Sequence, residues 1–245
     1  MYIDVFPTAD SIIPAQLAGK TALVIDVLRA TSTITTALNN GAVQIYPTAT
    51  IAEARRVASC FPAGTYLLGG ERKGVQIPGF DLDNSPLRYK KEIVAAKTII
   101  FTTSNGTKTI KHGKTAQTLL LAAFLNAKPA ARMAWETKQD IFLLCSGTNG
   151  RFSLDDAACA GLLIEYLRQL DKRARLSDLA FTLHQLYLSH CNRLPDLLAH
   201  ASHYRRLLDL NLQADIAYCL QTNICTIVPF WDGEKIIKKD GSSGE

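Results

Sequence analysis

Acidic side chains occur in this sequence at places where a buried carboxylate would need a partner. Asp26 ends an apolar run, Glu71 lies between a glycine pair and an arginine, and Asp155 and Asp156 stand together at the start of a predicted helix. A carboxylate that closes an apolar strand is costly to bury unless it meets a metal ion or an arginine. Asp26 and Glu71 with one of the two adjacent aspartates would form an oxygen-rich site suited to Mg²⁺. The other aspartate is expected to cap the helix.

Basic side chains accompany these carboxylates along the chain. They are Arg29, Arg72, Lys108 and Arg151. Arginine and lysine beside a divalent cation are suited to binding phosphate esters and other polyanions. The combination points to phosphoryl chemistry on a small substrate with several negative charges.

Cys145 offers a second route to the same chemistry. Five residues separate it from Arg151, at the end of a predicted strand, which is the spacing of cysteine-dependent phosphatases. In that mechanism a thiolate of low pKa lies under backbone N–H groups while an arginine grips the phosphate oxygens. Leu144 and Phe152 stand where those enzymes carry a histidine and a hydroxyl residue. The alternative is a buried cysteine followed by an arginine that faces an anion.

Two histidines, His200 and His203, lie three residues apart on a predicted helix and could share a metal ion. An exposed helix face explains them equally well, because no carboxylate-rich set lies beside them. We therefore do not assign them to a zinc site.

Three apolar strands that each run into a loop rich in Ser, Thr and Asn would position these residues. They span residues 22–33, 98–108 and 141–151. If the strands are parallel, the three loops leave the same edge of the sheet, where open α/β folds bind ligands. Each loop places backbone N–H groups at a helix start, which suits an anion. Helix capping alone explains any single loop, but three of them favour a shared anion site.

Short apolar runs alternate with amphipathic stretches along the chain, which is typical of α/β proteins. Strands are expected at 2–5, 21–27, 44–47, 66–68, 98–102, 116–120, 141–144 and 226–229, with a final hairpin to 235–239. Helices are expected at 33–40, 51–60, 104–112, 155–170, 177–190, 195–208 and 214–219. We predict a single domain over residues 1–245, with a two-lobe organisation as the alternative. The helix-rich segment 177–220 should cover one face or end of the sheet.

Composition narrows the possible partners and the cellular location. The chain has 245 residues, of which 47% are hydrophobic and 20% charged, and a net charge of +5. No dense run of basic residues or interleaved aromatics occurs, so nucleic-acid binding is not expected. No apolar run approaches the ~20 residues of a membrane span, and no signal peptide is visible. We expect a cytoplasmic protein with free cysteines, and the sequence leaves open whether it forms homo-oligomers.

Several short segments form an ordered pattern along most of the chain. They are 26–33, 70–72, 79–81, 84–86, 102–107, 145–147, 155–156, 160–161, Asp215 and 228–229. In this combination the sequence resembles the 2-phosphosulfolactate phosphatase (ComB) family. The stretch 176–212 carries no matching motif.

The resemblance implies a three-layer α/β/α fold with a mixed β-sheet. It also implies a Mg²⁺-dependent phosphatase that hydrolyses 2-phospho-3-sulfolactate to 3-sulfolactate and phosphate, with a link to coenzyme M biosynthesis. This substrate carries a phosphate, a sulfonate and a carboxylate, which suits three loops rich in N–H groups and flanked by arginines.

For this activity the candidate catalytic residues are Asp26, Arg29, Cys145 and Asp156. The candidate Mg²⁺ ligands are Asp26, Glu71 and Asp156. The candidate substrate-binding residues are Thr31, Ser32, Arg72, Asn105, Ser146 and Arg151. The nucleophile is left open between a metal-activated water, Asp26 and Cys145. The alternative from another class is a non-catalytic binding protein for small sulfonated or phosphorylated hydroxy acids.

Overall fold

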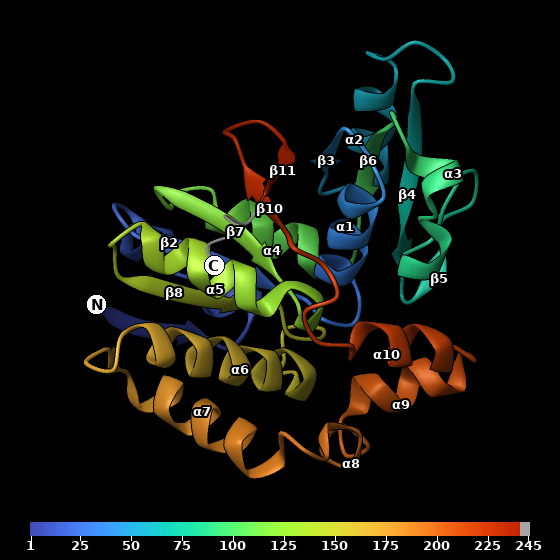
Figure 1. Ribbon diagram of the computed structural model, residues 1–245. Helices are drawn as coiled ribbons and strands as arrows, with labels where there is room; N and C mark the ends of the chain where they lie inside the picture. The colour runs from blue at the N-terminus through green and yellow to red at the C-terminus, as the bar shows by residue number, and fades with distance from the viewer. Residues whose placement is uncertain (241–245) are drawn as a thin grey trace.

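The computed structural model describes residues 1–240, which form a mixed sheet with helices on both faces (Figure 1). The eleven strands lie in the order β5-β4-β6-β3-β11-β10-β7-β2-β8-β1-β9. Their bounds are β1 Tyr2–Phe6, β2 Thr21–Ile25, β3 Gln44–Pro47, β4 Tyr66–Arg72, β5 Val75–Gln76, β6 Thr98–Thr102, β7 Thr118–Ala122, β8 Ile141–Cys145, β9 Arg175–Leu176, β10 Ile227–Trp231 and β11 Ile236–Asp240. The predicted α/β class and mixed sheet are confirmed.

The helices connect and cover these strands. Their bounds are α1 Ala30–Asn39, α2 Ile51–Ala58, α3 Lys91–Val94, α4 Gly106–Gly113, α5 Ala127–Glu136, α6 Leu154–Leu170, α7 Asp178–His190, α8 Leu194–Leu198, α9 Ser202–Asp209 and α10 Gln213–Cys219. Short 3₁₀ helices are η1 Ala9–Ser11, η2 Pro14–Leu17, η3 Pro86–Arg88 and η4 Phe124–Asn126. Within residues 1–240, no helix has the length and apolar character needed to cross a membrane.

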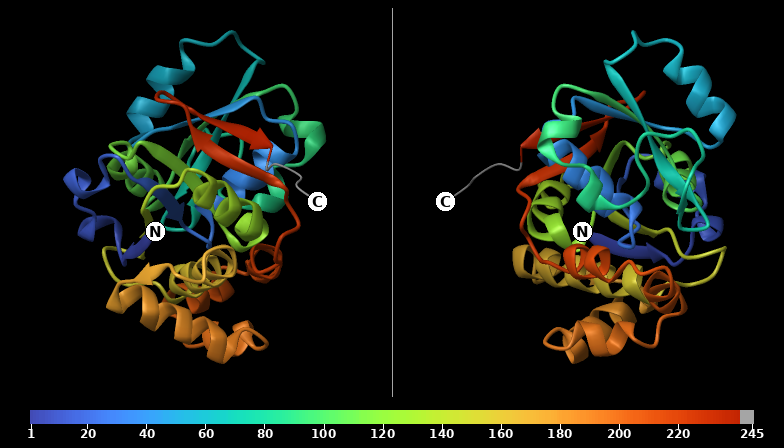
Figure 2. Two further views of the ribbon diagram at one scale, coloured as in Figure 1. Left: turned by 60° about the vertical axis from the view of Figure 1, so that its left-hand side comes forward. Right: turned by 90° about the vertical axis from the view of Figure 1, so that its right-hand side faces the viewer.

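Strand β2 shows how the apolar runs build the layers. Leu23 and Ile25 pack into a core with α5 and α6 on one face of the sheet. Ala22 and Val24 pack into a second core with α1 and α4 on the other face. Because successive side chains of a strand point to opposite faces, a strand covered on both sides needs a continuous apolar run. Helices lie on the two sides of the sheet in both further views, which confirms the three-layer arrangement (Figure 2).

The sheet consists of two parallel halves that run in opposite directions. One half contains β4, β6 and β3, and the other contains β7, β2, β8 and β1. Between them, the β10–β11 hairpin pairs antiparallel with β7 and with β3, through one residue pair on each side. The condition for three loops to leave a single parallel edge is therefore met by β2 and β8 but not by β6. The loop after β6 still reaches the loops after β2 and β8, because Ser104 and Asn105 line the same pocket as Asp26 and Asn149.

Helix α5 was not predicted from the sequence. Pro129 lies in its first turn, where a missing N–H group is tolerated, although a proline weakens a sequence-based helix assignment. The buried face consists of Ala127, Ala130, Ala131 and Ala134, so α5 is held by close packing more than by a pattern of large apolar residues. The single helix expected over 195–208 is also wrong, because the chain breaks it into α8 and α9.

The segment 178–219 forms a run of helices at one end of the molecule, as the sequence predicted (Figure 1, orange to red). Gly161 allows α6 to approach α7, since a Cβ at this position would overlap the Leu183 carbonyl group. At the other end of the segment, the Arg206 guanidinium donates to the Lys73 carbonyl at 2.8 Å. This contact places α9 next to the turn between β4 and β5.

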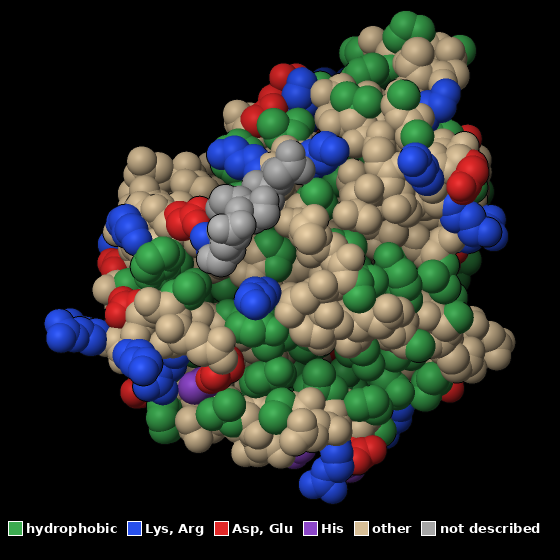
Figure 3. Space-filling model, in the orientation of Figure 1, with side chains coloured by type: hydrophobic (Ala, Val, Ile, Leu, Met, Phe, Trp, Pro, Cys, Tyr) green, Lys and Arg blue, Asp and Glu red, His purple; other side chains and the backbone are tan. Residues whose placement is uncertain are grey.

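The basic side chains do not gather into one patch on the face shown in Figure 3. Lysine and arginine groups there are separated by acidic, polar and apolar surface. This dispersion agrees with the absence of a dense basic run in the sequence.

Candidate active site

A cavity of about 250 Å³ lies where the loops of both half-sheets meet helix α9. Its lining residues come from the β2–α1 loop, the end of β4 and the turn to β5, the segment before η3, the loops after β6 and β8, and α9. They are Asp26, Leu28, Arg29, Glu71, Lys73, Gly74, Asn84, Ser104, Asn105, Thr148, Asn149, His203, Arg206 and Leu207. Four residues predicted from the sequence therefore share this pocket: Asp26, Arg29, Glu71 and Asn105.

Asp26 is the first residue of the β2–α1 loop, and only 8% of its surface is exposed. Its Oδ1 accepts a hydrogen bond from the Ala30 backbone N–H at 3.2 Å. Its Oδ2 faces Gly106 at the start of α4, where a Cβ would lie 2.6 Å from this oxygen. The pKa of Asp26 is raised to about 6, mainly by burial and with smaller contributions from the negative charges of Asp155 and Glu71. The carboxylate is thus held in a crowded acidic environment.

Glu71 is fixed by the turn that follows it. Its Oε2 accepts from the Gly74 N–H at 2.7 Å, and its Oε1 accepts from the Ser104 N–H at 2.7 Å. Gly70, with φ +134°, makes this possible because any side chain there would overlap the Thr102 carbonyl of β6. The close pairing of β4 with β6 therefore positions Glu71 beside the loop after β6.

Asp156 joins two loops and does not line the pocket. Its Oδ1 accepts from the Val27 N–H and its Oδ2 from the Gly147 N–H, both at 2.9 Å. Burial and the nearby charges of Asp155 and Asp26 raise the pKa of Asp156 well above its usual range. Asp155 lies in the first turn of α6 and accepts from the Ser153 hydroxyl. The N-cap residue is Ser153 and no side chain caps the helix there, so the expectation that one of the two aspartates is the cap is wrong. Asp156 thus ties the β2–α1 loop to the loop after β8.

Other residues predicted to bind substrate make contacts outside the cavity. The Thr31 hydroxyl donates to the Asp26 carbonyl at 2.9 Å, and the Ser32 hydroxyl to the Val27 carbonyl at 2.8 Å. These bonds shape the β2–α1 loop from within. Arg72 donates to the Thr102 hydroxyl at 2.9 Å and to the Glu71 carbonyl at 2.7 Å. None of the three residues lines the pocket.

The predicted residues at the end of β8 and in the loop that follows it lie in two different environments. Cys145 is 2% exposed and Ser146 is 1% exposed, and neither lines the pocket. Burial raises the pKa of the Cys145 thiol well above its usual range, with a further contribution from Asp156. Arg151 is exposed and lines a neighbouring groove together with His200 and Phe152. This environment disfavours a thiolate, which needs positive charge and exposure.

Several lining residues were not predicted from the sequence. His203 and Arg206 lie one turn apart on α9, and the His203 Nε2 is 2.6 Å from the Leu28 carbonyl oxygen. Lys73 directly follows Arg72, the predicted substrate-binding residue, and Asn84 lies in a segment to which no role was assigned. The spacing i, i+3 of the two α9 residues was the available signal for a shared face. Their location against the β2 loop depends on contacts distant in sequence.

The pocket carboxylates suit a Mg²⁺ ion. Asp26 and Glu71 are the only acidic residues among those that line it. Across residues 1–240, no group of three or more His, Cys, Asp or Glu side chains forms a complete metal cage. Mg²⁺ commonly binds one or two carboxylates and completes its shell with water and substrate phosphate oxygens. The two carboxylates therefore fit this ion as a pair, and Asp156 lies outside the pocket lining.

Comparison with known proteins assigns the chain to a family. The sequence model of the 2-phosphosulpholactate phosphatase family matches residues 7–234. A protein of Clostridium acetobutylicum named probable 2-phosphosulfolactate phosphatase is 39% identical, over 97% of this chain and 100% of the relative. A protein of Symbiobacterium thermophilum with the same name is 42% identical, over 91% of this chain and 96% of the relative. With most of its length matched, the chain belongs to the 2-phosphosulfolactate phosphatase family.

Proposed function

We propose that this protein is a Mg²⁺-dependent phosphatase that hydrolyses 2-phospho-3-sulfolactate to 3-sulfolactate and inorganic phosphate. The names of its relatives support the reaction. The observation that carries the proposal is the composition of the pocket, in which Asp26 and Glu71 share one cavity with Arg29, Lys73 and Arg206. Carboxylates suit a divalent cation, and the three basic side chains suit the phosphate, sulfonate and carboxylate of this substrate.

The chain's own residues can bind and orient the ester. Arg29 is 2% exposed, so its charge acts in a poorly solvated environment, where an interaction with phosphate is stronger than in water. Asn84, Ser104 and Asn105 add polar groups to the same wall. Asp26 and Glu71 would hold Mg²⁺. When bound, this ion would neutralise phosphate charge and favour attack at phosphorus.

The position of Cys145 favours the two nucleophiles that reach the pocket, a water molecule and Asp26. The stereochemical course at a chiral phosphate distinguishes them. One in-line displacement by water inverts the configuration, whereas two displacements through a phosphorylated Asp26 retain it.

Replacing Cys145 by alanine is expected to leave kcat within about threefold of wild type, because the thiol lies outside the pocket and burial opposes the thiolate. Phosphate release by the purified variant measures this. Loss of a small buried side chain should lower the free energy of unfolding by about 1 kcal/mol. A folded variant with no activity would restore the thiolate mechanism.

Replacing Arg206 by glutamine is expected to raise KM about 10- to 100-fold with a smaller change in kcat, as for loss of a charge-assisted hydrogen bond. Arg206 is exposed and lines the pocket, so its charge can meet substrate without being needed in the core. Arg205→Gln is the matched control, because this exposed neighbour donates to the His200 carbonyl and does not line the pocket. Equal effects of the two substitutions on KM would contradict a binding role for Arg206.

Phosphate release from a panel of phosphorylated 2-hydroxy acids, with and without Mg²⁺, tests the proposed function. We expect Mg²⁺-dependent turnover of 2-phospho-3-sulfolactate in preference to analogues that lack the sulfonate. Thermal stabilisation by the substrate without phosphate release would instead support the non-catalytic binding protein.

A further inference from the structure

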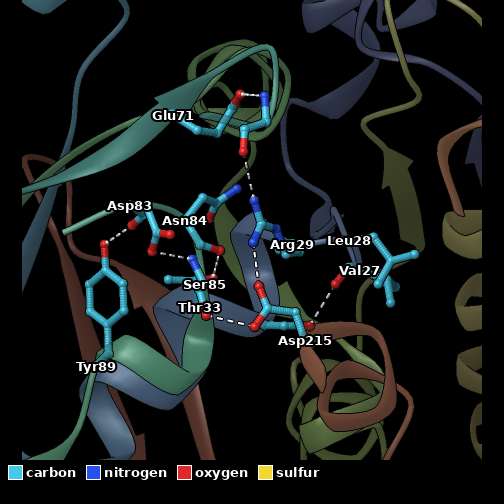
Figure 4. Close-up of polar contacts among 12 residues, drawn as sticks. Val27, Leu28, Arg29, Thr33, Glu71, Asp83, Asn84, Ser85, Tyr89 and Asp215 are labelled. Atoms are coloured by element: carbon cyan, nitrogen blue, oxygen red, sulfur yellow. Dashed lines mark hydrogen bonds and ion pairs between the residues drawn. The ribbon is translucent and has the colours of Figure 1, made fainter. Parts of the chain in front are cut away.

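Asp215 is a buried carboxylate that does not line the pocket but contacts a residue that does. It lies on α10 with 3% of its surface exposed. The Arg29 Nη1 donates to its Oδ2, and the Ser85 hydroxyl donates to its Oδ1 at 2.6 Å. Figure 4 shows Asp215 with Arg29 on one side and Ser85 on the other. Both carboxylate oxygens are therefore occupied by contacts that fix its orientation.

Arg29 is held at a second point by the turn that fixes Glu71. Its Nη2 lies 3.4 Å from the Gly74 carbonyl oxygen, and the Gly74 N–H donates to Glu71 at 2.7 Å. Figure 4 shows this continuous set of contacts from Glu71 through Arg29 to Asp215. A guanidinium carries five N–H donors, and these two contacts engage one each. Three donors remain for other acceptors, and Arg29 is among the residues that line the pocket.

We propose that Asp215 is a positioning residue that holds the Arg29 guanidinium in the orientation in which it binds the substrate phosphate. This proposal rests on the proposed phosphatase function and assigns a role to a residue outside the pocket. A buried arginine needs a counter-charge, and a single carboxylate fixed by Ser85 also defines where the arginine can point. The substrate phosphate and Asp215 then bind different N–H groups of the same guanidinium.

A purely structural ion pair would stabilise the fold without affecting the bound anion, and a double-mutant cycle separates the two roles. Asp215→Asn keeps the shape of the side chain and the acceptor for Ser85 but removes the charge. We expect it to lower kcat/KM about 100-fold, as small displacements of a catalytic group do. In an Arg29→Ala background the same substitution should change kcat/KM less than threefold, since Asp215 acts through Arg29.

The matched control is Asp209→Asn, which replaces an exposed aspartate at the end of α9. All variants are compared at a temperature well below their melting temperatures, so a role confined to stability has no effect on kinetics. Wild-type kinetics for folded Asp215→Asn would overturn the proposal. So would an equal loss of kcat/KM in both Arg29 backgrounds.

Binding of inorganic phosphate, measured by calorimetry, tests the proposal independently of turnover. We expect Asp215→Asn to raise the phosphate Kd at least tenfold and Asp209→Asn to leave it unchanged. Binding of phosphate by wild type without turnover would reject the proposed reaction, but the effect of Asp215→Asn on phosphate binding would still test the positioning role. No phosphate binding by wild type, or unchanged binding by Asp215→Asn, would overturn the positioning role.

Chemical rescue provides a second route if Asp215→Asn alone fails to fold, because the double variant Arg29→Ala/Asp215→Asn leaves no unpaired buried charge. Added guanidinium ion is expected to restore part of the activity of Arg29→Ala, because Asp215 remains to bind it. It should not restore Arg29→Ala/Asp215→Asn, in which both buried charges are absent. Equal rescue of the two proteins would overturn the proposal.

Discussion

Replacing Asp26 by asparagine is expected to lower kcat by on the order of 10³-fold, because a group that organises charge at the reacting phosphate is lost. Asparagine keeps the Oδ1 acceptor for the Ala30 N–H, so the β2–α1 loop should retain its shape. What changes is the charge on the oxygen that faces Gly106. Phosphate release under saturating substrate and Mg²⁺ measures the effect.

The same substitution is expected to stabilise the fold near neutral pH. The pKa of Asp26 is raised by burial from 3.8 to about 6, so the charged carboxylate costs folding free energy. Well below pH 3.8 the group is protonated in both the folded and the unfolded state and costs nothing. The cost grows between about pH 4 and pH 6, where the unfolded chain has lost this proton and the folded protein keeps it, and it stays constant at higher pH. Because one pKa unit corresponds to about 1.4 kcal/mol, Asp26→Asn should raise the free energy of unfolding by about 2–3 kcal/mol at pH 8.

Urea unfolding of wild type and Asp26→Asn at pH 4 and pH 8 checks this pattern. We expect the stability difference to be larger at pH 8. Asp209→Asn should change neither activity nor the pH dependence of stability, because its side chain is exposed. A folded Asp26→Asn enzyme with wild-type kcat would remove Asp26 from the reaction.

The framework of the fold could be predicted from the sequence because its strands are apolar on both faces. Every residue of β2 and β6 is buried and most are apolar, and β3 and β6 were predicted with the observed bounds. The direction of β6 relative to β2 could not be predicted, because the C-terminal hairpin between the half-sheets determines it. Hydrophobic periodicity gives the faces of a strand but not its partner.

The pocket was predictable where a residue type had few other uses. Asp26 and Glu71 were identified because acidic residues rarely follow apolar strands without a partner. The hydroxyls of Thr31 and Ser32 were less informative, since a hydroxyl in the first turn of a helix can donate to the backbone of the preceding loop, and both do so. The contact between Arg29 and Asp215 spans 186 residues along the chain, so no local spacing could reveal it.

Removal of divalent cations is expected to lower kcat by on the order of 10³-fold, and added Mg²⁺ should restore it. The pocket holds two carboxylates, and the pKa of Asp26 is raised by burial and by its acidic neighbours Asp155 and Glu71. A divalent cation would offset this repulsion, so its binding should stabilise the folded state as well as permit catalysis.

A thermal melt measures the cation without reference to turnover. Mg²⁺ should raise the melting temperature of wild type at pH 8, where Asp26 is charged, and much less at pH 5, below its pKa of about 6. Asp26→Asn should lose most of the shift at pH 8, whereas Asp209→Asn should keep it. Full activity after exhaustive chelation would reject the metal-dependent reaction. A Mg²⁺ shift that persists in Asp26→Asn would place the ion elsewhere, because Asp26 supplies one of only two carboxylates that line this pocket.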